Sequence, residues 1–234
     1  WLKVRAPGGE DYARVKNMMR SKALHTVCEE ARCPNITECW NAGTATFMIH
    51  GDTCTRSCAF CAVKTGRPLP IDLDEPRRVA EAIASMNLKH AVITSVNRDE
   101  MKDGGSIVWA EVIRASREMA PGTTIEVLVP DFKGNLENLQ RIIDAPPDIL
   151  NHNTETVPRL YKHVRPQGRF QWTLDVLRES KRQGMRTKTG VMLGLGEEPR
   201  EILEVMNELR AVEVDVLTLG QYLQPTKNHI PVDR

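Results

Sequence analysis

Six short apolar segments alternate with helical segments over residues 44–234, and this alternation constrains the fold more than any other feature of the sequence. Each segment is apolar or β-branched and is bounded by polar residues, Gly or Pro, which predicts a β-strand. The predicted strands are Thr44–His50, Ala91–Val96, Thr124–Val129, Ile149–His152, Thr187–Leu193 and Val216–Tyr222.

Apolar residues between these strands recur at intervals of three and four, which predicts amphipathic helices. The residues with this spacing are Val79, Ile83 and Met86, then Leu136, Leu139 and Ile143, then Ile202, Met206 and Leu209. Strands that alternate with helices form parallel βαβ units, which curl into a barrel or spread into an open doubly wound sheet. The sequence therefore predicts an α/β fold with its chemistry at the carboxyl ends of the strands.

The first 43 residues follow a different pattern. We expect a turn at Pro7-Gly8-Gly9 and a helix from Glu10 to Lys22, and the first three cysteines come after them. The predicted organisation is an N-terminal extension over residues 1–43, followed by the strand and helix region over residues 44–234.

All six cysteines lie between Cys28 and Cys61, and residues 62–234 contain none. A disulfide framework normally spreads its cysteines across the fold that it stabilises. Their concentration in one segment instead indicates metal binding in a reducing compartment.

The second cysteine triplet, Cys54-x3-Cys58-x2-Cys61, directly follows the first predicted strand. Three thiolates on one short loop can bind three irons of a [4Fe–4S] cluster. The fourth iron is then free to bind the amino and carboxylate groups of S-adenosylmethionine. The alternative is a structural zinc site, which needs four protein ligands, and His50 is the nearest candidate for the fourth.

The first triplet, Cys28-x4-Cys33-x5-Cys39, has the same composition in another short segment. It indicates a second cluster that is again one ligand short, and the alternative is again structural zinc. A scaffold with two zinc sites and no catalysis would need a fourth ligand for each triplet, and the sequence offers no obvious one.

The Cys54 triplet, with Phe60 before its last cysteine, resembles the radical S-adenosylmethionine superfamily. The two triplets together resemble the lipoyl synthase family within it, and the resemblance covers nearly the whole chain. It implies a partial (β/α)6 TIM-like barrel with an N-terminal cluster-binding extension. The further stretches that carry the resemblance are residues 43–49, 94–99, 151–156, 190–197 and 220–226.

The resemblance implies a transferase that inserts two sulfur atoms, at C6 and C8 of an octanoyl chain bound to a lysine of a carrier protein. The family uses 5′-deoxyadenosyl radicals from S-adenosylmethionine and takes sulfide from an auxiliary cluster. The implied cofactors are therefore two [4Fe–4S] clusters and S-adenosylmethionine. Another two-cluster enzyme, such as a methylthiotransferase acting on RNA or protein, is the nearest alternative, and it matches these stretches less well.

The implied cluster ligands are Cys28, Cys33, Cys39, Cys54, Cys58 and Cys61. Family precedent places the methionyl amino group at the Asp103-Gly104-Gly105 segment, since glycine lets backbone carbonyls approach an ammonium group closely. Three more residues are expected to contact S-adenosylmethionine, and they are Thr94, Asn153 and Glu155.

The family completes its auxiliary cluster with a serine oxygen from a C-terminal Arg-Ser-Ser-Tyr segment. This sequence ends at Arg234 without such a segment, so we expect the family's C-terminal piece, and the fourth ligand with it, to be missing here.

The implied partners are octanoylated lipoyl carrier domains of 2-oxoacid dehydrogenase complexes, the glycine cleavage H protein, and an electron donor such as ferredoxin or flavodoxin. The 32 basic and 31 acidic residues nearly balance, so we expect neither nucleic acid nor a membrane as a partner. The expected location is the cytoplasm, or a mitochondrion or plastid if a targeting segment has been trimmed.

Overall fold

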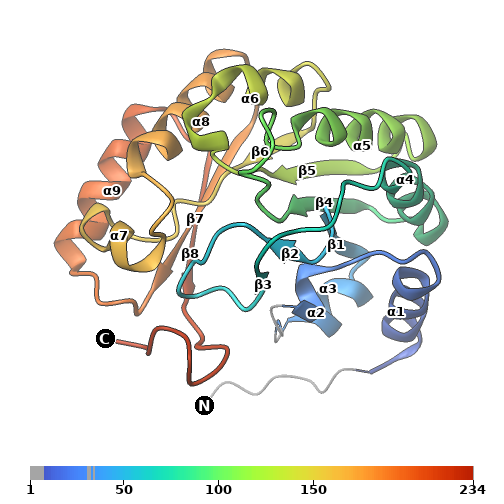
Figure 1. The fold of residues 1–234 in the computed structure, drawn as a ribbon, viewed down its shortest axis with the longest axis horizontal. Coiled ribbons are helices and arrows are strands. Elements are labelled where there is room, and N and C mark those ends of the chain that lie inside the picture. Colours follow the sequence, from blue (N-terminus) through green and yellow to red (C-terminus); the bar gives the residue numbers. More distant parts are fainter. Residues whose placement is uncertain (1–7, 31–32, 34, 234) are drawn as a thin grey trace.

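The computed structural model describes residues 8–30, 33 and 35–233. Six strands form one sheet whose spatial order follows the chain, with every neighbouring pair parallel. The strands are β1 (Thr44–Ile49), β4 (His90–Ser95), β5 (Thr124–Leu128), β6 (Ile149–Asn151), β7 (Thr187–Leu193) and β8 (Val216–Gln221). β1 and β8 form the two edges of an open, curved sheet (Figure 1), which confirms the partial barrel.

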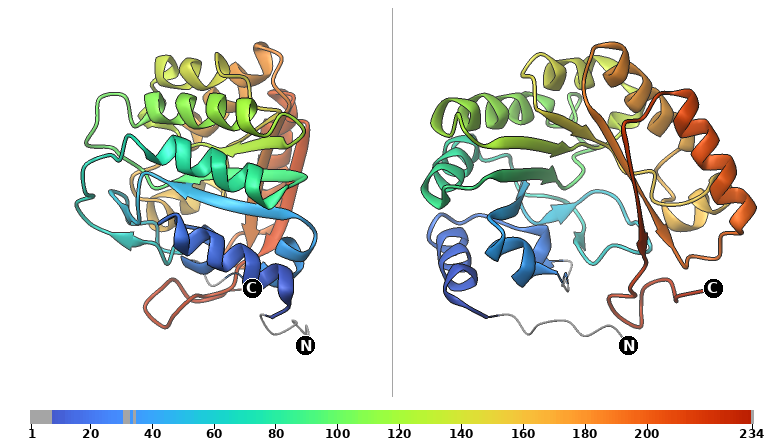
Figure 2. Two further views of the ribbon diagram at one scale, coloured as in Figure 1. Left: turned by 90° about the vertical axis from the view of Figure 1, so that its right-hand side faces the viewer. Right: turned by 180° about the vertical axis from the view of Figure 1, so that it is seen from behind.

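Helices cover the outer side of the arc, as the two further views also show (Figure 2). They are α4 (Glu75–Met86), α5 (Ser106–Met119), α6 (Leu136–Ile143), α8 (Phe170–Arg182) and α9 (Pro199–Ala211). The connection after β5 contains the 3-10 turn η1 (Phe132–Gly134), and the one after β6 contains the 3-10 turn η2 (Pro158–Leu160) and the short helix α7 (Tyr161–Val164). In the part of the chain that the structure describes, no helix has both the length and the apolar character needed to cross a membrane.

The two faces of the sheet differ in burial. Ala91, Ile93 and Val127, which pack with the helices in the main core, are fully buried. On the inner face, Val92 and Leu128 are only partly buried, whereas Thr94 and Glu126 are buried. Six strands do not close into a filled barrel, so the inner face keeps access to solvent.

The helical spacing predicted α4, α6 and α9 correctly, but two of the apolar residues that show this spacing are not buried. Met206 and Leu136 are each 38% exposed, so neither belongs to the buried core. In α9 the buried residues are Val205 and Leu209, four positions apart. One residue on an α-helix advances by about 100°, so Met206 next to Val205 is turned out of the core-facing side.

The N-terminal residues pack against the β1 edge and α4. They form α1 (Glu10–Ser21), α2 (Val27–Glu30) and α3 (Ile36–Asn41). His25 makes an antiparallel bridge to β1, where the Met48 N–H donates to the His25 carbonyl at 2.9 Å. The extension thereby covers an edge that would otherwise present unpaired backbone groups.

Val15, Met19 and Trp40 of the extension are at most 1% exposed and share one core with β1 and α4. The extension is therefore packed as part of the barrel, and the division at residue 43 stays a prediction. Pro7 of the expected turn lies outside the described residues.

A small charged network lies on the inner face of the sheet. Glu126 is 3% exposed and accepts from Lys188 Nζ at 2.9 and 3.1 Å and from Asn151 Nδ2 at 3.0 Å. Burial alone would raise the pKa of Glu126, but its hydrogen bonds with His90, Lys188 and Asn151 lower it to about 2. The carboxylate is therefore held ionised at neutral pH.

Glu126→Gln should destabilise the chain by about 3 kcal/mol, since it leaves the Lys188 ammonium without its counter-charge. The measurement is urea unfolding under anaerobic conditions. Glu111→Gln breaks the exposed pair with Arg114 and should change stability by less than about 0.5 kcal/mol. Equal losses for the two variants would show that the inner network contributes no more than a surface pair.

Candidate functional site

The loop that carries the second cysteine triplet is fastened to the loop after β4. It begins at β2 (Thr53–Cys54), which pairs with β3 (Lys64–Thr65), and it crosses in front of the middle of the arc (Figure 1). Cys54 Sγ accepts from the backbone N–H groups of Arg56 at 3.4 Å and Asn97 at 3.3 Å. The Asn97 carbonyl in turn accepts from the Thr55 N–H at 3.2 Å.

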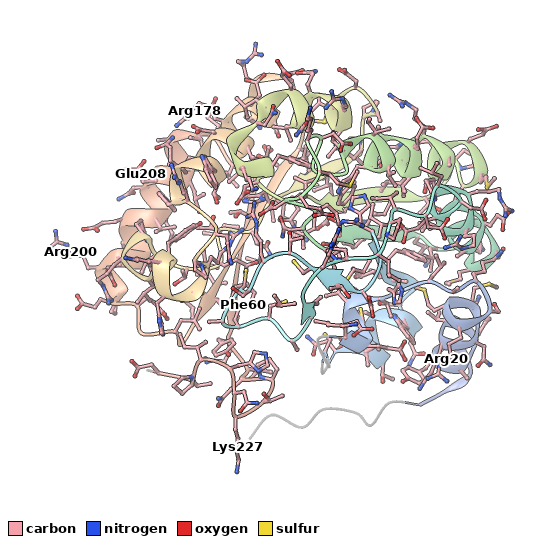
Figure 3. All side chains as sticks on the ribbon, in the orientation of Figure 1. Arg20, Phe60, Arg178, Arg200, Glu208 and Lys227 are labelled. Atoms are coloured by element: carbon pink, nitrogen blue, oxygen red, sulfur yellow. The ribbon has the colours of Figure 1, made fainter. Side chains whose placement is uncertain are left out.

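The second half of this loop is hydrogen-bonded to segments that follow β6 and β8. The Ala59 N–H donates to the Val164 carbonyl at 2.9 Å, and the Ala59 carbonyl accepts from the Ile230 N–H at 3.1 Å. The neighbouring Phe60 (Figure 3) packs on a small core that includes Val164 and Tyr222. These contacts fix all three thiols of the loop at the carboxyl ends of the strands, as the sequence predicted.

The three thiols of this loop lie close enough to affect one another's ionisation. Burial, together with repulsion from Cys61, Glu155 and Cys54, raises the pKa of Cys58 to about 12, although Arg165 acts to lower it. Burial also raises the pKa of Cys61, with added repulsion from Cys54 and Glu155. Without a cation the thiols of Cys58 and Cys61 therefore stay protonated at neutral pH, and a cationic group that displaces their protons suits this donor set.

The chemistry of the donor set favours a cluster over a single zinc ion, because three thiolates are one ligand fewer than structural zinc needs. No group of three or more His, Cys, Asp or Glu side chains among the described residues is arranged to hold one metal ion. A [4Fe–4S] cluster distributes three thiolates over three irons, so its ligands need not converge on one point. The residues present fit a cluster better than zinc.

His50, the fourth ligand considered for zinc, is packed elsewhere in the core. Its ring lies edge-on to Trp109 with centroids 6.3 Å apart, and neither ring nitrogen has a hydrogen-bond partner. Burial and the nearby Arg98 lower the pKa of His50 to about 4, so the ring is neutral at pH 7.

The first triplet is gathered by two short helices. Cys28 lies in α2, Cys39 lies in α3, and the Cys33 N–H between them donates to the Cys28 carbonyl at 3.0 Å. Burial raises the pKa of Cys33 and of Cys39; Cys28 raises both further, and Cys33 also raises that of Cys39. These three side chains form a second donor set with the same chemistry as the first.

Asn153 and Glu155, expected to contact S-adenosylmethionine, lie after β6 beside the cysteine loop. The Glu155 N–H donates to the Gly190 carbonyl at 2.8 Å, and Arg165 Nη1 donates to the Asn153 carbonyl at 2.8 Å. Burial raises the pKa of Glu155, and Arg165 lowers it. The same Arg165 acts on Cys58, and so does Glu155, so these three side chains lie within electrostatic range of one another.

The glycines of the Asp103-Gly104-Gly105 segment have a role in packing. Both have positive φ, 57° at Gly104 and 80° at Gly105, where α5 begins. A Cβ at Gly105 would lie 2.4 Å from His50 Cε1, and one at Gly104 would lie 2.9 Å from Phe132 Cδ1. Contacts within the chain thus already require glycine at both positions.

Asn97 stands closer to the cluster loop than this segment and was not singled out from the sequence. Besides its two backbone contacts with the loop, its side-chain Oδ1 is buried and has no hydrogen-bond partner. Buried polar atoms are normally paired, so an unpaired amide oxygen beside Cys54 suits a donor group on a ligand. Its position directly after a predicted strand was the available signal. Thr94, by contrast, already donates to the Leu128 carbonyl at 3.1 Å.

A second feature missed from the sequence is an ion pair inside the cysteine loop. Arg56 is 3% exposed and binds both Asp99, after β4, and Asp131, after β5. The only sequence signal for this ion pair was the position of a charged residue, Arg56, between the expected ligands Cys54 and Cys58. That signal did not identify the partners of Arg56.

Comparisons with known proteins identify the family of the chain. The Radical SAM superfamily pattern matches residues 48–209, and that of the N-terminal domain of lipoyl synthase matches residues 1–33. A lipoyl synthase of Rubrobacter xylanophilus is 59% identical over 100% of this chain and 74% of the relative. The mitochondrial lipoyl synthase of Nematostella vectensis is 54% identical over 99% of this chain and 80% of the relative.

Solved structures of more distant proteins share the fold. Methylornithine synthase matches with a TM-score of 0.63 at 13% identity, covering 92% of this chain and 66% of that protein. Streptococcus suis SuiB bound to S-adenosylmethionine matches with a TM-score of 0.64 at 8% identity, covering 97% of this chain and 50% of that protein. At such identities the likeness concerns the fold alone.

Family membership rests on the relatives that match the whole chain and on the superfamily pattern over the barrel. The superfamily implies a [4Fe–4S] cluster and S-adenosylmethionine as cofactors. This chain belongs to the lipoyl synthase family of radical S-adenosylmethionine enzymes, which insert sulfur in the synthesis of lipoate.

Proposed function

We propose that this chain inserts sulfur at C6 and C8 of an octanoyl chain carried on a lysine of a lipoyl carrier domain. The observation that supports this most directly is the pair of separate cysteine triplets, each with its thiols within electrostatic range of one another. One triplet suits the cluster that the superfamily shares, and the other offers a second site for a sulfide-bearing cluster.

Cys54, Cys58 and Cys61 would hold the first [4Fe–4S] cluster, and Cys28, Cys33 and Cys39 the second. When bound, the first cluster and S-adenosylmethionine supply the hydrogen-abstracting radical, and the second cluster supplies sulfide. Alkyl C–H bonds have no useful acidity, so general acid–base side chains cannot do this chemistry. The work of the protein is to position the groups and exclude water.

Asn97, Asn153 and Glu155 are the residues that we assign to binding S-adenosylmethionine. Asn97 offers an unpaired amide oxygen, and Glu155 offers a carboxylate beside Cys58. Either oxygen can accept from an amino or hydroxyl group. Thr94 and the Asp103–Gly105 segment stay weaker candidates, because contacts within the chain already account for them.

The proposed partners are octanoylated lipoyl domains of 2-oxoacid dehydrogenase complexes and the glycine cleavage H protein, with ferredoxin or flavodoxin as electron donor. Family membership supports the carrier class. The proposed location is the cytoplasm, and the relatives include both bacterial and mitochondrial enzymes.

Anaerobic reconstitution should give about eight irons per chain, and about four after either triplet is changed to alanine. Iron, acid-labile sulfide and zinc are measured on the same samples. The two triplets serve as controls for each other, because each variant leaves the other donor set intact. Stoichiometric zinc with little iron would contradict both cluster assignments.

Changing Cys28, Cys33 and Cys39 together to alanine should separate the cleavage of S-adenosylmethionine from the insertion of sulfur. The variant should still form 5′-deoxyadenosine from S-adenosylmethionine, since the other triplet is intact, but an octanoyl-lysyl peptide should gain no sulfur. Mass spectrometry of the peptide and chromatography of the nucleoside measure the two products. Sulfur insertion at the parental level by this variant would refute the role of the first triplet.

Glu155→Gln and Asn97→Ala should each raise the KM for S-adenosylmethionine by about tenfold or more, as expected for a lost hydrogen bond to a charged group. Initial rates of 5′-deoxyadenosine formation give the values. Gly105→Ala is the comparison variant, since it disturbs packing without removing a side-chain acceptor. If Gly105→Ala lowered thermal stability little and raised the KM most, the amino group would belong at residues 103–105 instead.

A further inference from the structure

The guanidinium of Arg56 is held from two sides by carboxylates of different loops. Its Nε and Nη2 donate to the two oxygens of Asp99 at 2.7 and 3.1 Å. Its Nη1 and Nη2 donate to the two oxygens of Asp131 at 2.7 and 2.6 Å. Both contacts are bidentate, the strongest geometry open to an arginine–carboxylate pair.

These contacts are secluded from water. The side chains of Arg56 and Asp131 are 2% and 1% exposed, and that of Asp99 is 18% exposed. Ion pairs of this kind differ from surface pairs, because removing one partner leaves a buried charge without compensation.

The network continues to the other side of the cysteine loop. Asp131 Oδ2 lies 3.8 Å from Arg165 Nη2, and Arg165 acts electrostatically on both Cys58 and Glu155. Two arginines and two aspartates therefore alternate in the order Asp99, Arg56, Asp131, Arg165. The formal charges of these four side chains sum to zero, and Arg165 brings the network within electrostatic range of Cys58.

We propose that Arg56 is a positioning residue: it ties the cluster loop to the loops after β4 and β5, and the balanced charges around it set the reduction potential of the cluster. The proposal rests on the proposed function for the presence of a cluster at the Cys54 triplet. It adds a role for residues that are not ligands.

The physical reason is the charge that the cluster gains when it is reduced. An extra electron is stabilised by net positive charge nearby and destabilised by net negative charge, and low local dielectric strengthens both effects. Asp131→Asn leaves the network one unit positive, and Arg56→Gln leaves it one unit negative. The two variants break the same contact but change the field in opposite directions.

The test is a redox titration of the full reconstituted chain, following the electron paramagnetic resonance signal that changes when S-adenosylmethionine is added. Asp131→Asn should shift its midpoint potential to less negative values, and Arg56→Gln to more negative values. The double variant restores charge balance and should return the potential toward that of the parent.

Arg56→Lys and Glu201→Gln complete the set. Arg56→Lys keeps the charge but loses the planar fork, so it should leave the potential near the parental value and lower iron retention on dilution. Glu201→Gln breaks the exposed bidentate pair with Arg159, at 2.7 and 2.8 Å, and should change neither quantity.

Shifts of the same sign for Asp131→Asn and Arg56→Gln, or no shift in either, would overturn the proposal, because a purely structural contact predicts no sign reversal. If Arg56→Gln fails to retain iron, Asp99→Asn takes its place: a less negative potential, as for Asp131→Asn, supports the proposal, and an unchanged one overturns it. A parent chain that binds zinc in place of iron contradicts the proposed function itself. If the parent chain binds its cluster but the variants show the same midpoint potential as the parent, only the proposed role of the charges is contradicted.

Discussion

The double contact of Arg56 with Asp99 and Asp131 is the interaction on which the arrangement of the site depends. The connections after β1, β4 and β5 leave the six-stranded sheet at three different strands, and no strand pairing of that sheet joins them to one another. A buried guanidinium with bidentate partners on two of these loops does so with defined geometry. Backbone contacts of Asn97 with Cys54 and of Val164 with Ala59 then hold the two halves of the loop that carries the second cysteine triplet.

Much of the fold could be predicted, because it depends on patterns that are local in sequence. Apolar runs located all six strands of the sheet to within one residue at each end, as in the segment Thr187–Leu193. Helical spacing located three helices but could not say how much of each one the sheet would cover. Met206 shows this, because the side of α9 that packs in the core runs through Val205 and Leu209 and leaves Met206 38% exposed.

The candidate site also contains some features that could be predicted from local sequence and others that could not. The six cysteines could be singled out from the sequence as candidate metal ligands, because few other roles require three thiols in so short a segment. The partners of Arg56 lie 43 and 75 residues away, and no local pattern pairs them. At Gly104 and Gly105 the need for glycine comes from Phe132 and His50, which pack there only in the folded chain. The sequence can therefore indicate that glycine is needed at these positions without revealing the packing contacts that require it.

The unequal burial of the two faces of the sheet separates the residues that hold the fold from those that line its interior. Outer-face residues such as Ile93 and Val127 carry the packing with the helices, so their replacement costs stability. Partly buried inner-face residues such as Val92 and Leu128 carry less of it. Sequence change can therefore accumulate on the concave side while the scaffold stays intact, which lets one architecture acquire new substrates without first acquiring a new fold.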